Sequence, residues 1–149
     1  MSSTFVGLNG SGFWMRDGTL ELWLRLLALH IEDPKKPGTI AAEIRDQWLF
    51  ASRGFFIACV PVMLERFANI PEGNSVIRKA VQSFLTVLEK EPGDLPKNLL
   101  SLIGMDGGFT TDFPTSALIE VGHAFCDLLD GKITLSVSGK GYMPGSGLH

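Results

Sequence analysis

The stretch "GFWMRDGTLELWLRLLALHI", residues 12–31, brings two tryptophans and six leucines together near the start of the chain. Its main apolar set recurs at helical spacing and consists of Leu20, Trp23, Leu24, Leu27 and Ile31. A second apolar row lies beside the first and is formed by Leu22, Leu26 and Leu29. The remaining polar or small stripe is narrow and comprises Glu21, Arg25, Ala28 and Glu32. A helix with this pattern needs cover on most of its circumference, so we predict that it is central to a helical bundle.

The composition of the chain favours a single globular domain. The 149 residues are 45% apolar and 19% charged, which is too apolar for a disordered chain. No apolar segment approaches the roughly 18 uninterrupted residues of a membrane helix, and residues 1–12 lack the pattern of a signal peptide. With only two cysteines, a disulfide framework is not expected. We therefore predict a cytoplasmic protein without membrane insertion and without a cofactor.

The charge of the chain argues against direct binding of nucleic acid. The formal net charge is −3, and no cluster of lysine and arginine exceeds two in a row. Neutralising phosphates normally requires a basic face, which this sequence does not offer. A basic protein partner is compatible with the negative charge.

Further helices are predicted on both sides of the breaks that proline and glycine make. Thr39 is a candidate N-cap for a helix with Ile44 and Trp48 on its apolar side. Later helices are expected from Pro61 to about Ala68, from Asn74 or Ser75 to about Glu89, around 97–103 and over 115–129. The segment "FFIACV", 55–60, is compatible with a short buried strand or an extended linker, and "ITLSVS", 133–138, alternates like one strand.

These elements predict a mainly α fold, a single-domain helical bundle of about five to six helices. At most a short β-strand or hairpin is expected near the termini. The domain is predicted to span 1–149, with a core over about 12–137. Segments 1–11 and 139–149, rich in small residues, are expected to be flexible or short and extended.

The best catalytic candidates lie in "EVGHAFCD", where Glu120, His123, Cys126 and Asp127 share or border one helical face. A Glu and a His three residues apart can bind a metal in a bundle, but such sites use a second pair that is missing here. Cys126 beside His123 has the residue types of a thiol nucleophile, yet a cysteine between apolar neighbours is usually an inert core residue. We therefore expect neither a metal site nor catalysis, and we expect Cys59 to be a core residue.

Three fragments together resemble a known family. They are "FWMRDGTLELWLRLLALHI", "IRDQWLFASRGFFIACVPVML" and "TSALIEVGHAFCDLLDGKI", and the similarity runs over about residues 12–133. In this order they look like the immunity proteins of bacterial contact-dependent growth inhibition systems, in the group that protects against ribonuclease toxins. The shared features are aromatic, glycine and aspartate positions.

The resemblance implies a small cytoplasmic protein that is not an enzyme. Such a protein binds the cognate toxin domain that a neighbouring cell delivers and covers its active site. A ribonuclease groove is basic, and an acidic protein can occupy it in place of RNA. The alternatives are a helical interaction or adaptor protein unrelated to toxins, and a small enzyme that uses His123 or Cys126.

The partner surface is predicted from exposure and charge, because the helix interiors are committed to the core. Acidic residues are expected from the second helix, from "EKEPGDLP" and from the loop "GMDGGFTTDFP", with aromatic side chains as apolar anchors. The predicted toxin-binding residues are Trp14, Glu43, Asp46, Glu91, Asp94, Asp106, Phe109 and Asp112.

Overall fold

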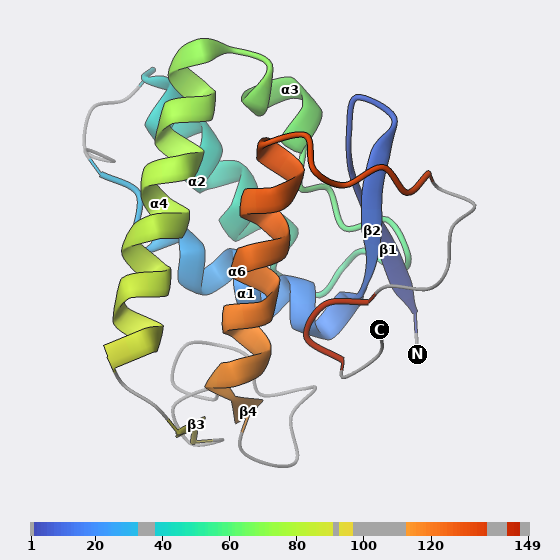
Figure 1. Ribbon diagram of the computed structural model, residues 1–149. Helices are drawn as coiled ribbons and strands as arrows, with labels where there is room; N and C mark the ends of the chain where they lie inside the picture. The colour runs from blue at the N-terminus through green and yellow to red at the C-terminus, as the bar shows by residue number, and fades with distance from the viewer. Residues whose placement is uncertain (1, 33–37, 91–92, 97–112, 137–142, 147–149) are drawn as a thin grey trace.

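The computed structural model describes residues 2–32, 38–90, 93–96, 113–136 and 143–146 of the chain. Within these ranges the fold consists of five helices and two small antiparallel hairpins (Figure 1). The elements in chain order are β1 (Ser3–Leu8), β2 (Ser11–Arg16), α1 (Asp17–Ala28), α2 (Ile40–Ala51), α3 (Leu64–Ala68), α4 (Pro71–Lys90), β3 (Asp94–Leu95), β4 (Phe113–Pro114) and α6 (Thr115–Leu129).

The expected mainly α bundle is wrong, because the helices are combined with β structure in an α+β fold. Strands β1 and β2 pair over their whole length, from Ser3 opposite Arg16 to Leu8 opposite Ser11. Their turn contains Asn9 and Gly10, both with positive φ, which is the geometry of a tight two-residue hairpin turn. The strands β3 and β4 form the second hairpin, of two residues each. Residues 3–8 thus form a strand, which is the extended alternative of the two expected for segment 1–11.

The N-terminal hairpin contributes one face to the core. Thr4, Val6 and Leu8 alternate inward along β1, and Phe13 and Met15 are buried on β2. The ring of Phe13 meets Phe125 of α6 edge to face, with centroids 5.7 Å apart. The hairpin therefore covers the bundle at the side of α6 that Figure 1 shows on the right.

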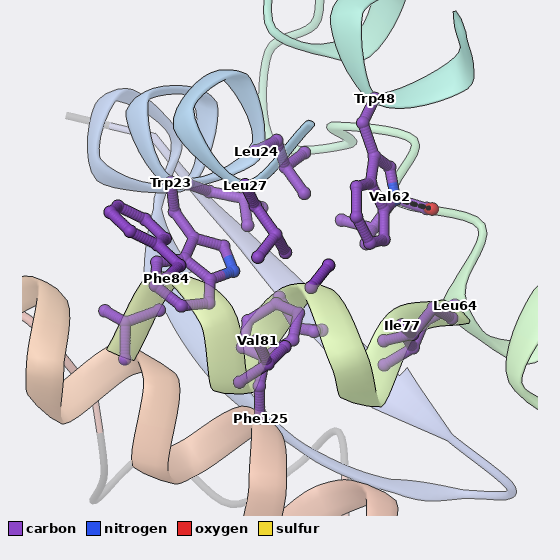
Figure 2. Close-up of a cluster of buried hydrophobic side chains, with 14 of the residues drawn as sticks. Trp23, Leu24, Leu27, Trp48, Val62, Leu64, Ile77, Val81, Phe84 and Phe125 are labelled. Carbon is purple, nitrogen blue, oxygen red and sulfur yellow. Dashed lines mark hydrogen bonds between the residues drawn. The ribbon is translucent and has the colours of Figure 1, made fainter. Parts of the chain in front are cut away.

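The helix α1 is central, as the sequence predicts. Leu20, Trp23, Leu24 and Leu27 are fully buried, and Trp23 stacks on Phe84 of α4. Figure 2 shows Trp23 and Leu27 directed toward α4 and α6, where Phe84, Val81 and Phe125 lie. Ala28, which was assigned to the polar stripe, is buried, whereas Leu29 is exposed because the helix ends at Ala28.

The two long helices α4 and α6 pack closely against each other. A Cβ at Gly122 would lie 2.4 Å from a methyl carbon of Leu85, so any larger residue at this position would require the Leu85 side chain to move. Arg78 on α4 also donates to the Leu129 carbonyl at 2.9 Å and to the Asp130 carboxylate at 2.6 Å. The predicted bounds of α6, 115–129, are confirmed.

Several predicted helix starts are displaced. Thr39 caps α2 as expected, since its side chain accepts from the Ala42 N–H at 3.2 Å. The third helix begins at Leu64, not at Pro61, because residues 54–63 are irregular. The helix α4 begins at Pro71, which suits the first turn of a helix, so Asn74 lies inside it.

The predicted strand over 133–138 is wrong where the structure describes it. Residues 133–136 form no strand, although the Leu135 carbonyl accepts from the Gly12 N–H at 2.8 Å. Of the segment 139–149, the structure describes residues 143–146, which include a turn in which Pro144 is buried. The predicted helix at 97–103 lies outside the described residues. Within the described ranges, no helix has the length and apolar character needed to cross a membrane.

Candidate protein-binding surface

The carboxylate of Asp17 holds three segments of the chain together. It accepts hydrogen bonds from the Thr4 hydroxyl at 2.7 Å, from the Ala58 N–H at 2.7 Å and from the Ser2 hydroxyl. Asp17 is a residue type that often caps a helix, but here it is the first helical residue of α1 and is buried. Because three donors already occupy this carboxylate, it acts as an anchor and does not present free oxygens to a ligand.

The segment 54–63 has no regular structure, and side chains hold its backbone in place. The Val60 N–H donates to the Thr4 hydroxyl at 3.1 Å. The Gln47 amide donates to the Pro61 carbonyl at 3.0 Å, and the Trp48 indole N–H donates to the Val62 carbonyl at 3.1 Å (Figure 2). These bonds satisfy backbone groups that a strand or helix would otherwise pair. Of the two alternatives for 55–60, a strand or a linker, the structure shows an irregular linker.

This anchored segment exposes large apolar side chains. Phe55 is 73% exposed and Ile57 is 77% exposed, and Met63 at the end of the segment is also exposed. Phe56 lies between them, partly buried against Phe50 at a centroid distance of 5.2 Å. Isolated exposed apolar residues are ordinary, but several of them on one anchored segment make that segment a candidate interaction site. We call residues Phe55–Met63 and the outer face of the β1–β2 hairpin the hairpin-side surface.

The outer face of the hairpin carries an aromatic pair. Phe5 and Trp14 are opposite each other in the register, and their rings meet edge to face at 5.4 Å. Both side chains are partly buried, so each leaves part of its ring accessible. Trp14, a predicted binding residue, therefore lies on the hairpin-side surface.

An open groove of about 540 Å³ lies beside the Asp17 anchor. Its walls come from the start of α1, from Phe56 and Ile57, and from the turn at Gly145 and Ser146. Burial, followed by repulsion from Asp17, raises the pKa of Glu21 in this groove above its ordinary value. The groove extends the accessible apolar area around Ile57.

The predicted acidic residues do not form one cluster. Glu43 is paired with Arg66 of α3, and Asp46 with Arg45 at 2.9 Å, so the chain's own arginines offset both charges. Asp94 is exposed on β3, beyond the far end of α4. In Figure 1, β3 lies at the end of α4 opposite to α3, so Asp94 and the Glu43–Arg66 pair lie at different ends of the fold. Glu91, Asp106, Phe109 and Asp112 lie outside the described residues.

The candidates for catalysis on α6 differ in their exposure and in their surroundings. His123 is exposed, and its Nε2 atom lies 3.8 Å from Glu89 Oε1. Burial, followed by the Asp130 and Asp127 carboxylates, raises the pKa of the Cys126 thiol, which disfavours the nucleophilic thiolate. Across the described ranges, no group of three or more His, Cys, Asp or Glu residues could hold a metal ion.

Sequence reasoning missed the residues that define this surface. Cys59 was expected in the core but is exposed, and Phe55 and Ile57 were read as part of a strand or linker. The left-handed backbone of Ala58, with φ of 61°, turns the segment outward, and no residue type announces that conformation at this position.

Comparisons with models of protein families, with curated proteins and with solved structures found no match for this chain.

Proposed function

We propose that the protein is an immunity protein of a contact-dependent growth inhibition system. It binds a cognate toxin, a ribonuclease domain, in the cytoplasm and covers the toxin's active site without carrying out a reaction of its own. Two things support this proposal. The first is the resemblance of residues 12–133 to such proteins, and the second is the hairpin-side surface.

The observation that carries the proposal is the exposure of Phe55 and Ile57 on an anchored backbone. Large apolar side chains supply most of the energy in protein interfaces when they fill pockets on the partner. Ordering a flexible loop on binding costs free energy, and a backbone already held by Asp17 and Thr4 avoids much of that cost. The segment therefore has the properties of a preformed binding element.

In this proposal, the negative net charge of the chain favours its approach to a basic toxin. Glu43 and Asp46 are paired within the chain, so they are poor candidates for direct pairs with a basic toxin. The net charge of −3 still favours approach to a basic nuclease, most strongly at low salt. Glu91, Asp94, Asp106 and Asp112 remain predicted contacts, together with the aromatic residues Trp14 and Phe109.

Co-expression with the product of the neighbouring open reading frame tests the proposal. We expect a stable complex, and we expect the purified chain to suppress ribonuclease activity of the partner in a one-to-one titration. A complex in which nuclease activity persists would identify an adaptor protein instead. Turnover of a substrate that is lost in His123→Ala or Cys126→Ala, with unchanged melting temperature, would identify an enzyme.

A further inference from the structure

The register of the N-terminal hairpin determines which backbone groups of β1 point away from β2. Asp17 N–H donates to the Ser2 carbonyl at 3.1 Å, so Ser2 and Asp17 form a hydrogen-bonded pair at the end of the ladder. Such pairs alternate with non-bonded pairs along an antiparallel ladder. Phe5–Trp14 and Gly7–Gly12 are therefore non-bonded pairs. The hydrogen bond of Gly12 agrees with this alternation, because its N–H points away from β1 and donates to the Leu135 carbonyl.

It follows that Phe5 and Gly7 direct their N–H and C=O groups to the outer edge of β1. Within the described part of the chain, no backbone or side-chain hydrogen bond to these outward groups is formed. The edge is closed at its end, because the Asn9 N–H donates to Glu65 Oε1 at 3.1 Å. An unpaired edge of this kind is a template for another extended chain.

A groove of about 450 Å³ lies directly along this edge. One wall is β1 from Phe5 to Gly7, and the other is the segment from Val60 to Arg66. Of the apolar residues along it, Phe5 and Met63 are accessible, whereas Val60 and Val62 are buried beneath it. Adjacent strands lie about 4.8 Å apart, so a strand paired with β1 would lie along the edge on which this groove opens.

The outward backbone groups of β1 determine which kind of ligand is complementary to this edge. N–H donors and C=O acceptors alternate along β1, and only another extended backbone offers the complementary series at the same spacing. The second wall restricts the occupant to a single strand, because a folded copy of this chain would bring a whole hairpin against Val60–Arg66. An extended segment of a partner, with apolar side chains at alternate positions, is favoured over a second copy.

We infer that the outer edge of β1 binds an extended peptide segment of a partner protein, which adds a third strand to the β1–β2 hairpin. The inference deepens the proposed function and rests on it for the identity of the partner, because the segment would belong to the toxin. The recognition itself uses backbone hydrogen bonds at Phe5 and Gly7 and apolar contacts in the groove.

Selection of a random-sequence peptide library displayed on phage, with the full chain as bait, tests this recognition without the toxin. We expect the selected peptides to alternate apolar and polar residues. We also expect them to slow hydrogen exchange at the Phe5 and Gly7 amides, which exchange fast in the free protein, whereas the Val6 amide is protected in both states. Peptides that protect other amides, or a selection that yields no binder, would overturn the inference.

A matched pair of variants isolates the backbone bond. Gly7→Pro removes the outward N–H without breaking a bond to β2, and Gly7→Ala adds a Cβ at the same place but keeps the N–H. We expect Gly7→Pro to bind a selected peptide about tenfold more weakly than Gly7→Ala, as the loss of one hydrogen bond implies. Equal affinities would contradict pairing at this edge.

A dimer formed through the β1 edge is the alternative to a peptide partner. The failure of this inference and the failure of the proposed function give different results. If protection of the Phe5 and Gly7 amides in the free chain increased with protein concentration, the edge would pair with a second copy and the inference would be wrong. If peptides bind the edge but no toxin is neutralised, the proposed function fails while the edge site stands.

Discussion

The carboxylate of Asp17 and the backbone N–H of Ala58, 41 residues apart in the chain, are joined by a hydrogen bond of 2.7 Å. The same carboxylate accepts hydrogen bonds from the Thr4 and Ser2 hydroxyls. One buried side chain therefore connects the hairpin, the start of α1 and the segment that exposes Ile57. The position of the proposed binding segment thus depends on Asp17.

Replacing Asp17 with Ala should lower the free energy of unfolding by about 2–3 kcal/mol, because buried donors lose their acceptor. Amide exchange at Ala58 should become faster at the same time. Urea unfolding and hydrogen exchange measure the two effects. The exposed Asp46, replaced by Ala, is the control and should change stability by less than about 0.5 kcal/mol. Unchanged exchange at Ala58 would show that the segment does not need the anchor.

The double variant Phe55→Ala, Ile57→Ala should leave stability nearly unchanged, within about 0.5 kcal/mol, because both side chains are exposed. Binding of the partner should weaken by about 2 kcal/mol or more, which is roughly thirtyfold in affinity. Calorimetric titration measures the change. Leu29→Ala is a matched control, since Leu29 is 70% exposed at the opposite end of α1. Equal affinities for both variants would remove Phe55 and Ile57 from the interface.

Glu21 should make stability depend on pH. Burial and Asp17 raise its pKa, so the native state binds the proton more tightly than the unfolded chain does. The stabilising contribution of protonation is full below the ordinary pKa and is lost as the pH rises through the raised native value. Glu21→Gln should therefore be more stable than the natural chain at neutral pH and similar to it in acid. Urea unfolding across this pH range measures the difference; a variant less stable at neutral pH would refute the assignment.

The two thiols should differ in reactivity. Cys59 is exposed, whereas Cys126 is partly buried and has a raised pKa. Iodoacetamide at neutral pH should modify Cys59 first, as followed by mass spectrometry of the intact chain. In the Cys59→Ser variant, only the slow modification of Cys126 should remain, and its rate should increase as the pH rises. Fast modification of Cys126 in this variant would reopen its candidacy as a nucleophile.

The helical part of the fold could be predicted because periodicity identifies long amphipathic helices well. Leu20, Trp23, Leu24 and Leu27 are buried as expected, and α6 has its predicted bounds. The Asn9–Gly10 pair is a hairpin signal in the sequence, and it predicts the turn between β1 and β2. The expectation of a short hairpin near the termini agrees with β1–β2, whereas the mainly α class does not describe the α+β fold.

The binding surface could not be predicted in the same way. Its geometry depends on tertiary hydrogen bonds from Asp17, Thr4 and Trp48 to a segment with no regular pattern. An apolar run such as 55–60 is usually buried, and only these distant acceptors and donors keep it at the surface. The pairing of Glu43 with Arg66 is likewise a contact between separate helices, which charge patterning along the sequence does not reveal.

Hydrogen exchange of the chain, free and in complex with its co-expressed partner, locates the interface in one experiment. The proposed surface requires slower exchange on complex formation in residues 3–7 and 53–63, with little change along the outward side of α4. Protection confined to Asp94 and β4, or to the start of α2, with residues 53–63 unaffected, would place the interface elsewhere and refute the proposed role of the hairpin-side surface.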